Sequence, residues 1–399
     1  MDNFISREGI SEALGENLCD EIVKFHKILP PITLFKSIPD FHSVIDQNFT
    51  QLDDYCPVLF QKDEIQSYRK SLHEAYDTLK PLEKIRIKDG WVRAGHGDLH
   101  TQNICIFNGK PLLFDAIEFE DDFVVSDVLY DICFLIMDLW QRDQKPAANR
   151  IFNQYIHQIG WLDKPDQLSV LKLMPFFLSM RAGIRTHVAA SRYAQSANQA
   201  EKIRYRDEAL ELFNASQKFL KTSAPMVIAI GGFSGSGKST LATNMAHHIG
   251  DAPGALRIRS DVIRRKLIGW DDYSPMPQTA YTVDQSIAVY AHMKDLMIDA
   301  INAGQSVIID AVLDRHQDRQ DFGAVARDLD VNFKGLWLSV DEDVMSDRIT
   351  GRTRDASDAT VEVMQLQMAR NSDAVTDWDN LDANGEETEI TKAALQLLQ

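Results

Sequence analysis

The chain has few cysteines and a shortage of positive charge. Its four cysteines form no CxxC pair and none follows Cys133, so neither a disulfide framework nor a cysteine zinc site is expected. No apolar run is long enough to span a bilayer, and no basic-then-apolar leader opens the sequence. Acidic residues outnumber basic ones, 59 to 42, giving a formal net charge of -17. This balance argues against non-specific attraction to nucleic acids or anionic membranes, and we expect a cytoplasmic protein.

The length and the pattern of the chain predict two domains. A chain of 399 residues exceeds what one ordinary hydrophobic core organises. Residues 1–220 show helical periodicity, interrupted by a hairpin signal at Asn108-Gly109, and the polar stretch at 221–225 is the expected linker. From 226 to 399, apolar strands alternate with helices. This alternation predicts an α/β domain with a parallel sheet and helices on both faces.

A glycine-rich motif, GGFSGSGKST, lies between an apolar strand and a helix. It contains G-x-x-x-x-G-K-S, in which main-chain amides cradle phosphates, the lysine reaches the terminal phosphates and the serine ligates Mg²⁺. The sequence therefore predicts a site for ATP and Mg²⁺. The expected binding residues are Gly232, Ser234, Gly235, Ser236, Gly237, Lys238, Ser239 and Thr240.

Carboxylates follow two of the predicted strands. Asp310 ends SVIID and is expected beside the loop, either as a Mg²⁺ ligand or as a helix cap, and the two roles are compatible. Asp261 and Arg264 follow another strand, at the edge where such sheets bind ligands. Asp261 is the candidate base for a substrate hydroxyl; the alternative is a capping aspartate with a surface arginine. Tyr273 and Tyr281 lie in the segment 270–286, here called the excursion, which we expect to contact the acceptor. The two tyrosines either stack on a ring of the acceptor or only pack the excursion against the rest of the domain.

Three arginines, Arg348, Arg352 and Arg354, lie close together in an otherwise acidic region. We expect them in a lid that offsets the charge developing during phosphoryl transfer. The alternative is a solvated helix face with local ion pairs.

Together these motifs resemble the AAA_33-type P-loop kinases, which are relatives of polynucleotide kinase, gluconate kinase and zeta-toxin-like enzymes. The resemblance covers nearly all of 226–380 and includes the series R-x-x-x-R-x-R-D-A-S-D-A, in which Asp358 matches without an assigned role. It implies that Asp261 is a general base and that the three arginines contact ATP. It leaves the acceptor open, and the acidic chain favours a small-molecule or nucleotide-like acceptor over a polynucleotide.

A second phosphotransfer motif, HGDLHTQN followed by LLFDAIEF, lies in the first half. In kinase catalytic loops an aspartate orients the acceptor hydroxyl, and an asparagine and a second aspartate bind metal. Asp98, Asn103 and Asp115 occupy these positions. The stretch resembles the aminoglycoside phosphotransferase (choline-kinase-like) family, which implies a mostly helical protein-kinase-like C-lobe for residues 1–220.

The glycine-rich cover and the strand lysine that such kinases require are not found in residues 1–90. We therefore expect the small N-lobe to be missing, with a partner chain as one source of it. The order of the two regions resembles a class of bacterial two-domain proteins whose longer members carry that lobe. The preferred function is an ATP-dependent kinase acting through its C-terminal domain. The alternatives are an ATP-binding regulatory or scaffold protein with a degenerate first lobe, and an aminoglycoside kinase using Asp98.

Overall fold

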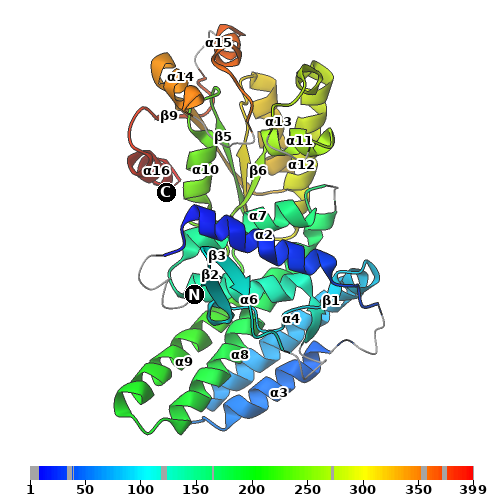
Figure 1. Cartoon of the computed structure of the whole chain (residues 1–399), viewed down its shortest axis with the longest axis vertical. Helices are drawn as coiled ribbons and strands as arrows, with labels where there is room; N and C mark the ends of the chain where they lie inside the picture. Colours follow the sequence, from blue (N-terminus) through cyan, green and yellow to red (C-terminus); the bar gives the residue numbers. More distant parts are fainter. Residues whose placement is uncertain are drawn as a thin grey trace. The chain divides into compact units, whose positions relative to one another are not determined.

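The computed structural model separates the chain into two compact units (Figure 1). The first comprises Met1–Ile159 and Lys172–Thr222, and the second comprises Gly160–Leu171 and Ser223–Gln399. The predicted linker at 221–225 spans the later division, whereas the sequence did not indicate that Gly160–Leu171 belongs with the second unit. The described residues are 9–33, 38, 40–117, 124–163, 166–270, 274–351, 357–370 and 375–398.

The first unit is mainly helical. Its small strands form two antiparallel pairs, β1 with β4 and β2 with β3, and the predicted Asn108-Gly109 turn joins the second pair. The strands are β1 (Val92–Ala94), β2 (Ile104–Phe107), β3 (Lys110–Leu113) and β4 (Val125–Asp127). The α-helices are α2 (Glu12–Ile28), α3 (Phe41–Asp53), α4 (Lys62–Lys88), α6 (Val128–Gln141), α7 (Lys145–Ile159), α8 (Met174–Gln195) and α9 (Gln199–Leu220). The 3₁₀ helix η2 (Thr101–Asn103) also belongs to this unit, whereas the division at Leu171 falls within the 3₁₀ helix η3 (Gln167–Leu173).

Helix α6 forms the centre of the first unit. Every residue from Val128 to Leu139 is buried, including Asp131 and Asp138, as in a helix that packs against neighbours on all sides. Asp127 caps this helix by accepting from the Leu129 amide at 2.8 Å, and it also receives two hydrogen bonds from Arg86, at 2.7 and 2.8 Å. The buried charge of Asp127 is therefore paired, and the start of α6 is fixed to the end of α4.

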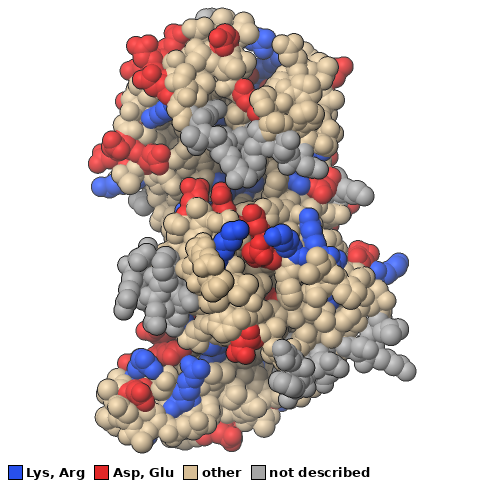
Figure 2. Space-filling view, viewed as in Figure 1, with Lys and Arg blue, Asp and Glu red and all other residues tan. Residues whose placement is uncertain are grey.

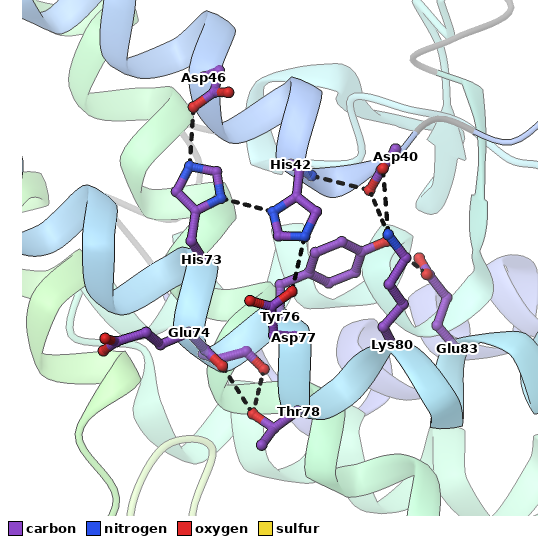
Figure 3. Close-up of polar contacts among 11 residues, drawn as sticks. Asp40, His42, Asp46, His73, Glu74, Tyr76, Asp77, Thr78, Lys80 and Glu83 are labelled. Carbon is purple, nitrogen blue, oxygen red and sulfur yellow. Dashed lines mark hydrogen bonds and ion pairs between the residues drawn. The ribbon is translucent and has the colours of Figure 1, made fainter.

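Two stacked histidines join α3 to α4 (Figure 3). The Nδ1 atoms of His42 and His73 are 2.7 Å apart, so one of them donates and the other accepts. Each ring also meets a carboxylate through Nε2: His73 contacts Asp46 at 2.9 Å, and His42 contacts Asp77 at 3.0 Å. This relay of four side chains ties the first turn of α3 to the middle of α4.

We expect the two histidines to be energetically coupled. His42→Gln and His73→Gln should each lower the free energy of unfolding by about 0.5–1.5 kcal/mol. The double variant should lose less than the sum, by at least ~0.5 kcal/mol, because both changes break the same contact. Urea unfolding of the full chain measures these values. His42→Gln combined with Gln66→Ala, at an exposed α4 position, is the control and should be additive. Additive histidine effects would show that the Nδ1 contact contributes nothing.

The second unit is built on a five-stranded parallel sheet in the order β6-β7-β5-β8-β9. This arrangement confirms the predicted parallel α/β sheet. The strands are β5 (Met226–Gly231), β6 (Leu256–Arg259), β7 (Val307–Asp310), β8 (Asn332–Ser339) and β9 (Asp379–Asp382). The helices are α10 (Lys238–Ala246), α11 (Ser260–Leu267), α12 (Val283–Asn302), α13 (His316–Asp328), α14 (Glu342–Thr350), α15 (Val361–Arg370) and α16 (Glu387–Gln396), with the 3₁₀ helix η4 (Gln278–Tyr281).

Helices cover both faces of this sheet (Figure 1). On one face, α10 and α16 bury Leu241, Met245 and Ile390 in a cluster with Ile228 of β5 and Leu336 of β8. Helices α12 and α13 pack on the other side. Because the strands are parallel, their carboxyl ends share one edge, which receives the loops after β5, β6 and β7.

The segment Gly160–Leu171 is held in the second unit by three polar contacts. His292 Nε2 lies 2.9 Å from the Leu162 carbonyl oxygen, and the Leu168 amide donates to Asp299 at 2.7 Å. Lys266 forms an ion pair with Asp163. The second unit therefore includes part of the region predicted as the first domain. Within the described ranges, no helix is both long enough and apolar enough to cross a membrane.

Candidate functional site

The glycine-rich loop follows β5 and leads into α10, as predicted. Gly232, Gly235 and Gly237 have φ values of 149°, 85° and 91°, which side-chain-bearing residues rarely adopt. A Cβ atom on Gly235 would lie 2.6 Å from the carbonyl oxygen of Met345 in α14, so α14 packs directly against the loop. The backbone conformation and the α10 N-terminus form the arrangement that binds phosphate in such loops.

Lys238 and Ser239 lie at the start of α10. Lys238 Nζ donates to the Phe233 carbonyl oxygen at 2.9 Å, which places the ammonium group over the loop. Ser239 Oγ donates to Asp310 Oδ2 at 2.6 Å, and Arg259 Nε lies 3.2 Å from the same oxygen. The predicted position of Asp310 beside the loop is confirmed, because β7 pairs with β5 in a register that places Asp310 opposite Ile230.

The side chains of Ser239 and Asp310 fit a Mg²⁺ ion that takes its remaining ligands from phosphate oxygens and water. Hydroxyl and carboxylate oxygens are suitable ligands, and Mg²⁺ usually takes one or two protein groups together with phosphate oxygens and water. Among the described residues, no group of three or more His, Cys, Asp or Glu side chains is placed to hold a metal by itself. A magnesium ion here would therefore depend on the nucleotide phosphates for further ligands.

Asp261 lies in the first turn of α11, and the alternative considered for it, that of the helix N-cap, is wrong. The N-cap residue is Arg259, because the strand β6 passes directly into a helix that begins at Ser260. Burial raises the pKa of Asp261, repulsion from Asp310 raises it further, and the charges of Arg259 and Lys238 offset part of the rise. A hydrogen bond from Ser357 also favours the ionised form. Asp261 is thus a carboxylate with increased proton affinity beside the phosphate-binding loop.

A cleft of about 830 Å³ brings most of the predicted site together. Arg348 lies at its wall, where Nη2 donates to Ala383 O at 2.9 Å and Nη1 lies 3.4 Å from Ser236 O. Three predicted residues, Tyr273, Arg352 and Arg354, lie outside the described residues. The predicted residues that line the cleft are Ser234, Gly235, Ser236, Gly237, Lys238, Ser239, Thr240, Asp261, Arg264, Tyr281, Asp310 and Arg348.

Asp358 links three parts of this site. Its Oδ1 accepts from Arg265 Nη2 at 2.5 Å, and its Oδ2 accepts from the Met276 amide at 2.7 Å and from the Tyr281 hydroxyl at 3.2 Å. The neighbouring Ser357 bonds to Asp261. The sequence contained both residues in its matched series but gave Asp358 no role. The structure shows that this carboxylate fixes the excursion that carries Tyr281.

Gln367 is a contact that the sequence did not indicate at all. It lies on α15, far along the chain from the loop, and its Oε1 accepts from the Ser234 amide at 2.9 Å. No motif includes this glutamine, so only the packing of α15 could reveal it. The segment containing Ser357, Asp358 and Gln367 therefore contacts Asp261, the excursion and the glycine-rich loop.

Two of the residues predicted for the first unit, Asp98 and Asn103, are in contact. Asn103 Nδ2 donates to Asp98 Oδ2 at 2.8 Å, and Asp115 is exposed beyond β3 with φ of 60°. Burial would raise the pKa of Asp98, but the hydrogen bonds from His100 and Asn103 and the charges of His100 and Arg181 hold it below its usual value. Metal binding by Asn103 and Asp115, and catalysis by Asp98, remain predictions.

Hydrogen bonds from deeper residues hold the loop around Asp98. Arg181 stacks on Tyr130 and donates through Nη1 to Gly97 O at 2.9 Å. Asp131 accepts from the amides of His96 and Gly97, at 2.8 and 3.1 Å. Asp131 and Arg181 thus both support the loop that carries Asp98.

Comparison with known families identifies the domain that contains the cleft. Residues 227–373 match the AAA_33 family, described as an AAA domain. The second unit therefore carries an AAA_33 P-loop domain. This finding supports the nucleotide-binding and P-loop predictions for the second unit, while the resemblance of the first unit to aminoglycoside phosphotransferases stays a prediction.

Several longer or shorter proteins are similar to this chain. The uncharacterized proteins Rv2004c of Mycobacterium tuberculosis (strain H37Rv) and Mb2027c of Mycobacterium bovis are each 28% identical over 337 residues, covering 84% of this chain and 64% of the relative. This chain thus spans about two thirds of their length. A gluconokinase from Sinorhizobium meliloti 1021 is 21% identical, with TM-score 0.32, covering 43% of this chain and 91% of its own. The Mycobacterium tuberculosis APS kinase CysC, solved with AMPPNP and APS, is 15% identical, with TM-score 0.31, covering 44% and 98%.

Proposed function

We propose that the chain is an ATP-dependent kinase whose reaction takes place in the second unit, on a hydroxyl group of a small acceptor molecule. The observation that carries this proposal is that one cleft contains the phosphate-binding loop, the Ser239–Asp310 pair and the carboxyl group of Asp261. A phosphate anchor and a base in one cleft are what hydroxyl phosphorylation requires, since phosphoryl transfer depends mainly on positioning and charge stabilisation.

Each residue has a separate task in this proposal. The loop amides and the N-terminus of α10 hold the phosphates, and Lys238 adds a positive charge beside them. Ser239 and Asp310 would hold Mg²⁺, which offsets phosphate charge when bound. Arg348 supplies a further positive charge at the loop. Together these groups stabilise the negative charge on the transferred phosphoryl group.

Asp261 would accept the proton of the attacking hydroxyl. Its raised pKa means that it binds a proton more strongly than an ordinary carboxylate, which favours proton transfer once the group is ionised. The hydrogen bond from Ser357 helps to keep it ionised and fixes its orientation. The contact also joins the base to the segment that follows the lid arginines in sequence.

The charge of the chain supports a small-molecule acceptor. Acidic residues exceed basic ones by 17 over the whole sequence. On the face drawn in Figure 2, the described Lys and Arg side chains are interspersed with Asp and Glu rather than joined in a basic band. A polynucleotide acceptor would favour the opposite distribution, because its phosphates require a continuous positive surface.

A structure of the full chain with Mg²⁺ and a non-hydrolysable ATP analogue tests the proposal. We expect the triphosphate to lie against Ser234–Ser239 and the metal to contact Ser239, directly or with Asp310 through water. The contrary result is nucleotide bound only beside Asn103 and Asp115, with the 232–240 loop empty. That outcome would move the reaction to the first unit.

A further inference from the structure

The cleft extends beyond the phosphate-binding loop to a region formed by α11, η4, α12, α13 and the loop after β7. We call this part the acceptor end, because it lines the same cleft as Asp261 and lies outside the glycine-rich loop. None of its residues on α12 and α13 belongs to a sequence motif. The side chains that define the acceptor end are Arg264, Tyr281, Tyr290, Lys294, Asp314, Arg315, Asp318 and Asp321.

The acceptor end has no surplus of positive charge among its described side chains. Its three basic residues (Arg264, Lys294 and Arg315) are balanced by three aspartates, and Asp261 adds a fourth carboxylate at the border with the loop. One of the basic groups is already paired, because Lys294 Nζ lies 3.1 Å from Asp321 Oδ2. A phosphate or carboxylate brought here would lose its hydration and gain too few cations in return.

The same region offers hydrogen-bond donors that are not used by the fold. Arg264 is only 8% exposed, and its Nη1 donates to Ala280 O at 2.8 Å, but its buried Nε has no hydrogen-bond partner within the described part of the chain. Tyr290 accepts from the Leu313 amide at 3.3 Å, which leaves its hydroxyl proton to donate. Burial raises the pKa of Tyr290 well above its ordinary value, so this proton is retained.

The acceptor end also contains carboxyl groups that can accept hydrogen bonds. Burial raises the pKa of Asp318, and repulsion from Asp314 and Asp321 adds to the rise, against the charges of Arg315 and Lys294. A carboxyl group in these surroundings gains from a hydroxyl or ammonium donor. The acceptor end thus presents donors and acceptors together, as is needed to bind neighbouring hydroxyl groups, each of which both donates and accepts.

Resting on the proposed function, we propose that the acceptor is a polyhydroxylated molecule without an anionic group: a sugar, a cyclitol or an amino sugar. Its hydroxyl oxygen forms a bond to the γ-phosphorus of ATP. The bond from that phosphorus to the β,γ-bridging oxygen breaks, and its electron pair leaves with ADP. The hydroxyl proton passes to Asp261. Arg264, Tyr290 and Asp318 hold the remaining hydroxyl groups.

Matched pairs of acceptors, which differ only in an anionic group, test this proposal. The full-length protein is given ATP and Mg²⁺, and ADP release is followed with glucosamine, glucose, ribose, glycerol and adenosine, each beside its phosphate monoester, and with glucuronate. We expect the member without an anionic group to have the higher kcat/KM in every pair that reacts, by at least ~10-fold, which corresponds to ~1.4 kcal/mol. A preference for the phosphorylated members, or for glucuronate over glucose, would overturn the proposal.

Charge variants make the test specific to the acceptor end. Asp318→Asn should raise KM for the preferred acceptor by about 10-fold or more with a smaller change in kcat, because a hydrogen-bond acceptor for the bound hydroxyl groups is lost. Asp295→Asn, on the exposed side of α12, is the matched control and should leave both constants unchanged. Equal KM values in Asp318→Asn and in the control would remove Asp318 from the proposal.

A binding experiment covers the case in which no member of the panel is phosphorylated. The ADP-saturated protein is titrated with glucosamine 6-phosphate and with AMP by calorimetry. We expect no binding tighter than about 1 mM, since the acceptor end cannot neutralise a phosphate group. Submillimolar binding that is lost in Arg264→Ala would overturn the proposal. Failure of the kinase assignment looks different, because ADP release would then be insensitive to Lys238→Ala.

Discussion

ADP release by the Lys238→Ala variant is expected to fall by at least ~100-fold relative to the unchanged protein, as for loss of one preorganised charge-stabilising donor. Lys238 Nζ lies over the glycine-rich loop, bonded to Phe233 O at 2.9 Å, so the substitution removes a positive charge beside the expected phosphates. A water molecule in the space left by the shortened side chain cannot supply the lost positive charge. A coupled assay for ADP, with the acceptor panel present, measures the effect.

The control for this variant is Lys392→Ala, which removes an exposed lysine from α16. It should keep the full rate of ADP release. Thermal unfolding of both variants should be close to that of the unchanged protein, because the Lys238 side chain is only partly buried. Unchanged ADP release in Lys238→Ala would place ATP turnover outside the second unit and would contradict the proposed function.

Asp261→Asn is expected to lower kcat by about 10²–10⁴-fold while leaving ATP affinity nearly unchanged, the usual range for loss of a general base. The asparagine keeps the shape of the side chain but cannot take a proton. In the proposed mechanism the loop and Ser239 set the affinity for nucleotide, and the substitution leaves both unchanged. Steady-state kinetics and binding of a fluorescent ATP analogue separate the two effects.

The pH dependence gives a second reading of the same residue. The pKa of Asp261 is raised, so in the unchanged protein the rate should increase with pH as this carboxyl ionises, at a pH above the ordinary aspartate range. The acid limb should be absent from the residual rate of Asp261→Asn. Ionisation of Asp261 should raise the rate but lower the stability of the fold, because a raised pKa means that the folded protein favours the protonated carboxyl group. The Asp261→Asn variant, whose side chain stays neutral, should therefore be at least as stable as the unchanged protein at neutral pH.

The pH profile of the rate and the stability of the variant together distinguish loss of the proton acceptor from unfolding as the cause of lost activity. An inactive Asp261→Asn variant with an undiminished Tm has lost a chemical group rather than its structure. A variant with normal kcat and an unchanged acid limb would show that another group accepts the proton, and Asp261 would then be part of the charge pattern only.

The phosphate-binding loop was predictable because its chemistry is local. Glycines at 232, 235 and 237 supply the φ values that curl the chain, and Lys238 and Ser239 must follow them directly. The alternation of apolar strands and helices after residue 226 was sufficient for a parallel sheet. The place of Asp310 followed from the same rule, since the ends of parallel strands share one edge.

Other parts of the site could not be predicted in this way. The cap assignment of Asp261 was wrong because β6 continues into α11 without an intervening turn. Asp358 was visible in a motif, but its contacts with Arg265, Met276 and Tyr281 depend on two segments separated by about eighty residues. Such contacts depend on packing rather than on local conformation.

The sequence by itself determined where phosphate binds in the second unit, because backbone conformation, helix start and charge are encoded within ten consecutive residues. Only the tertiary structure decided what surrounds that loop: the Gln367 contact, the attachment of Gly160–Leu171 to the second unit, and the balanced charges of the side chains at the acceptor end. The physical reason is that side chains far apart in sequence acquire partners only when the sheet and its helices fix their separation.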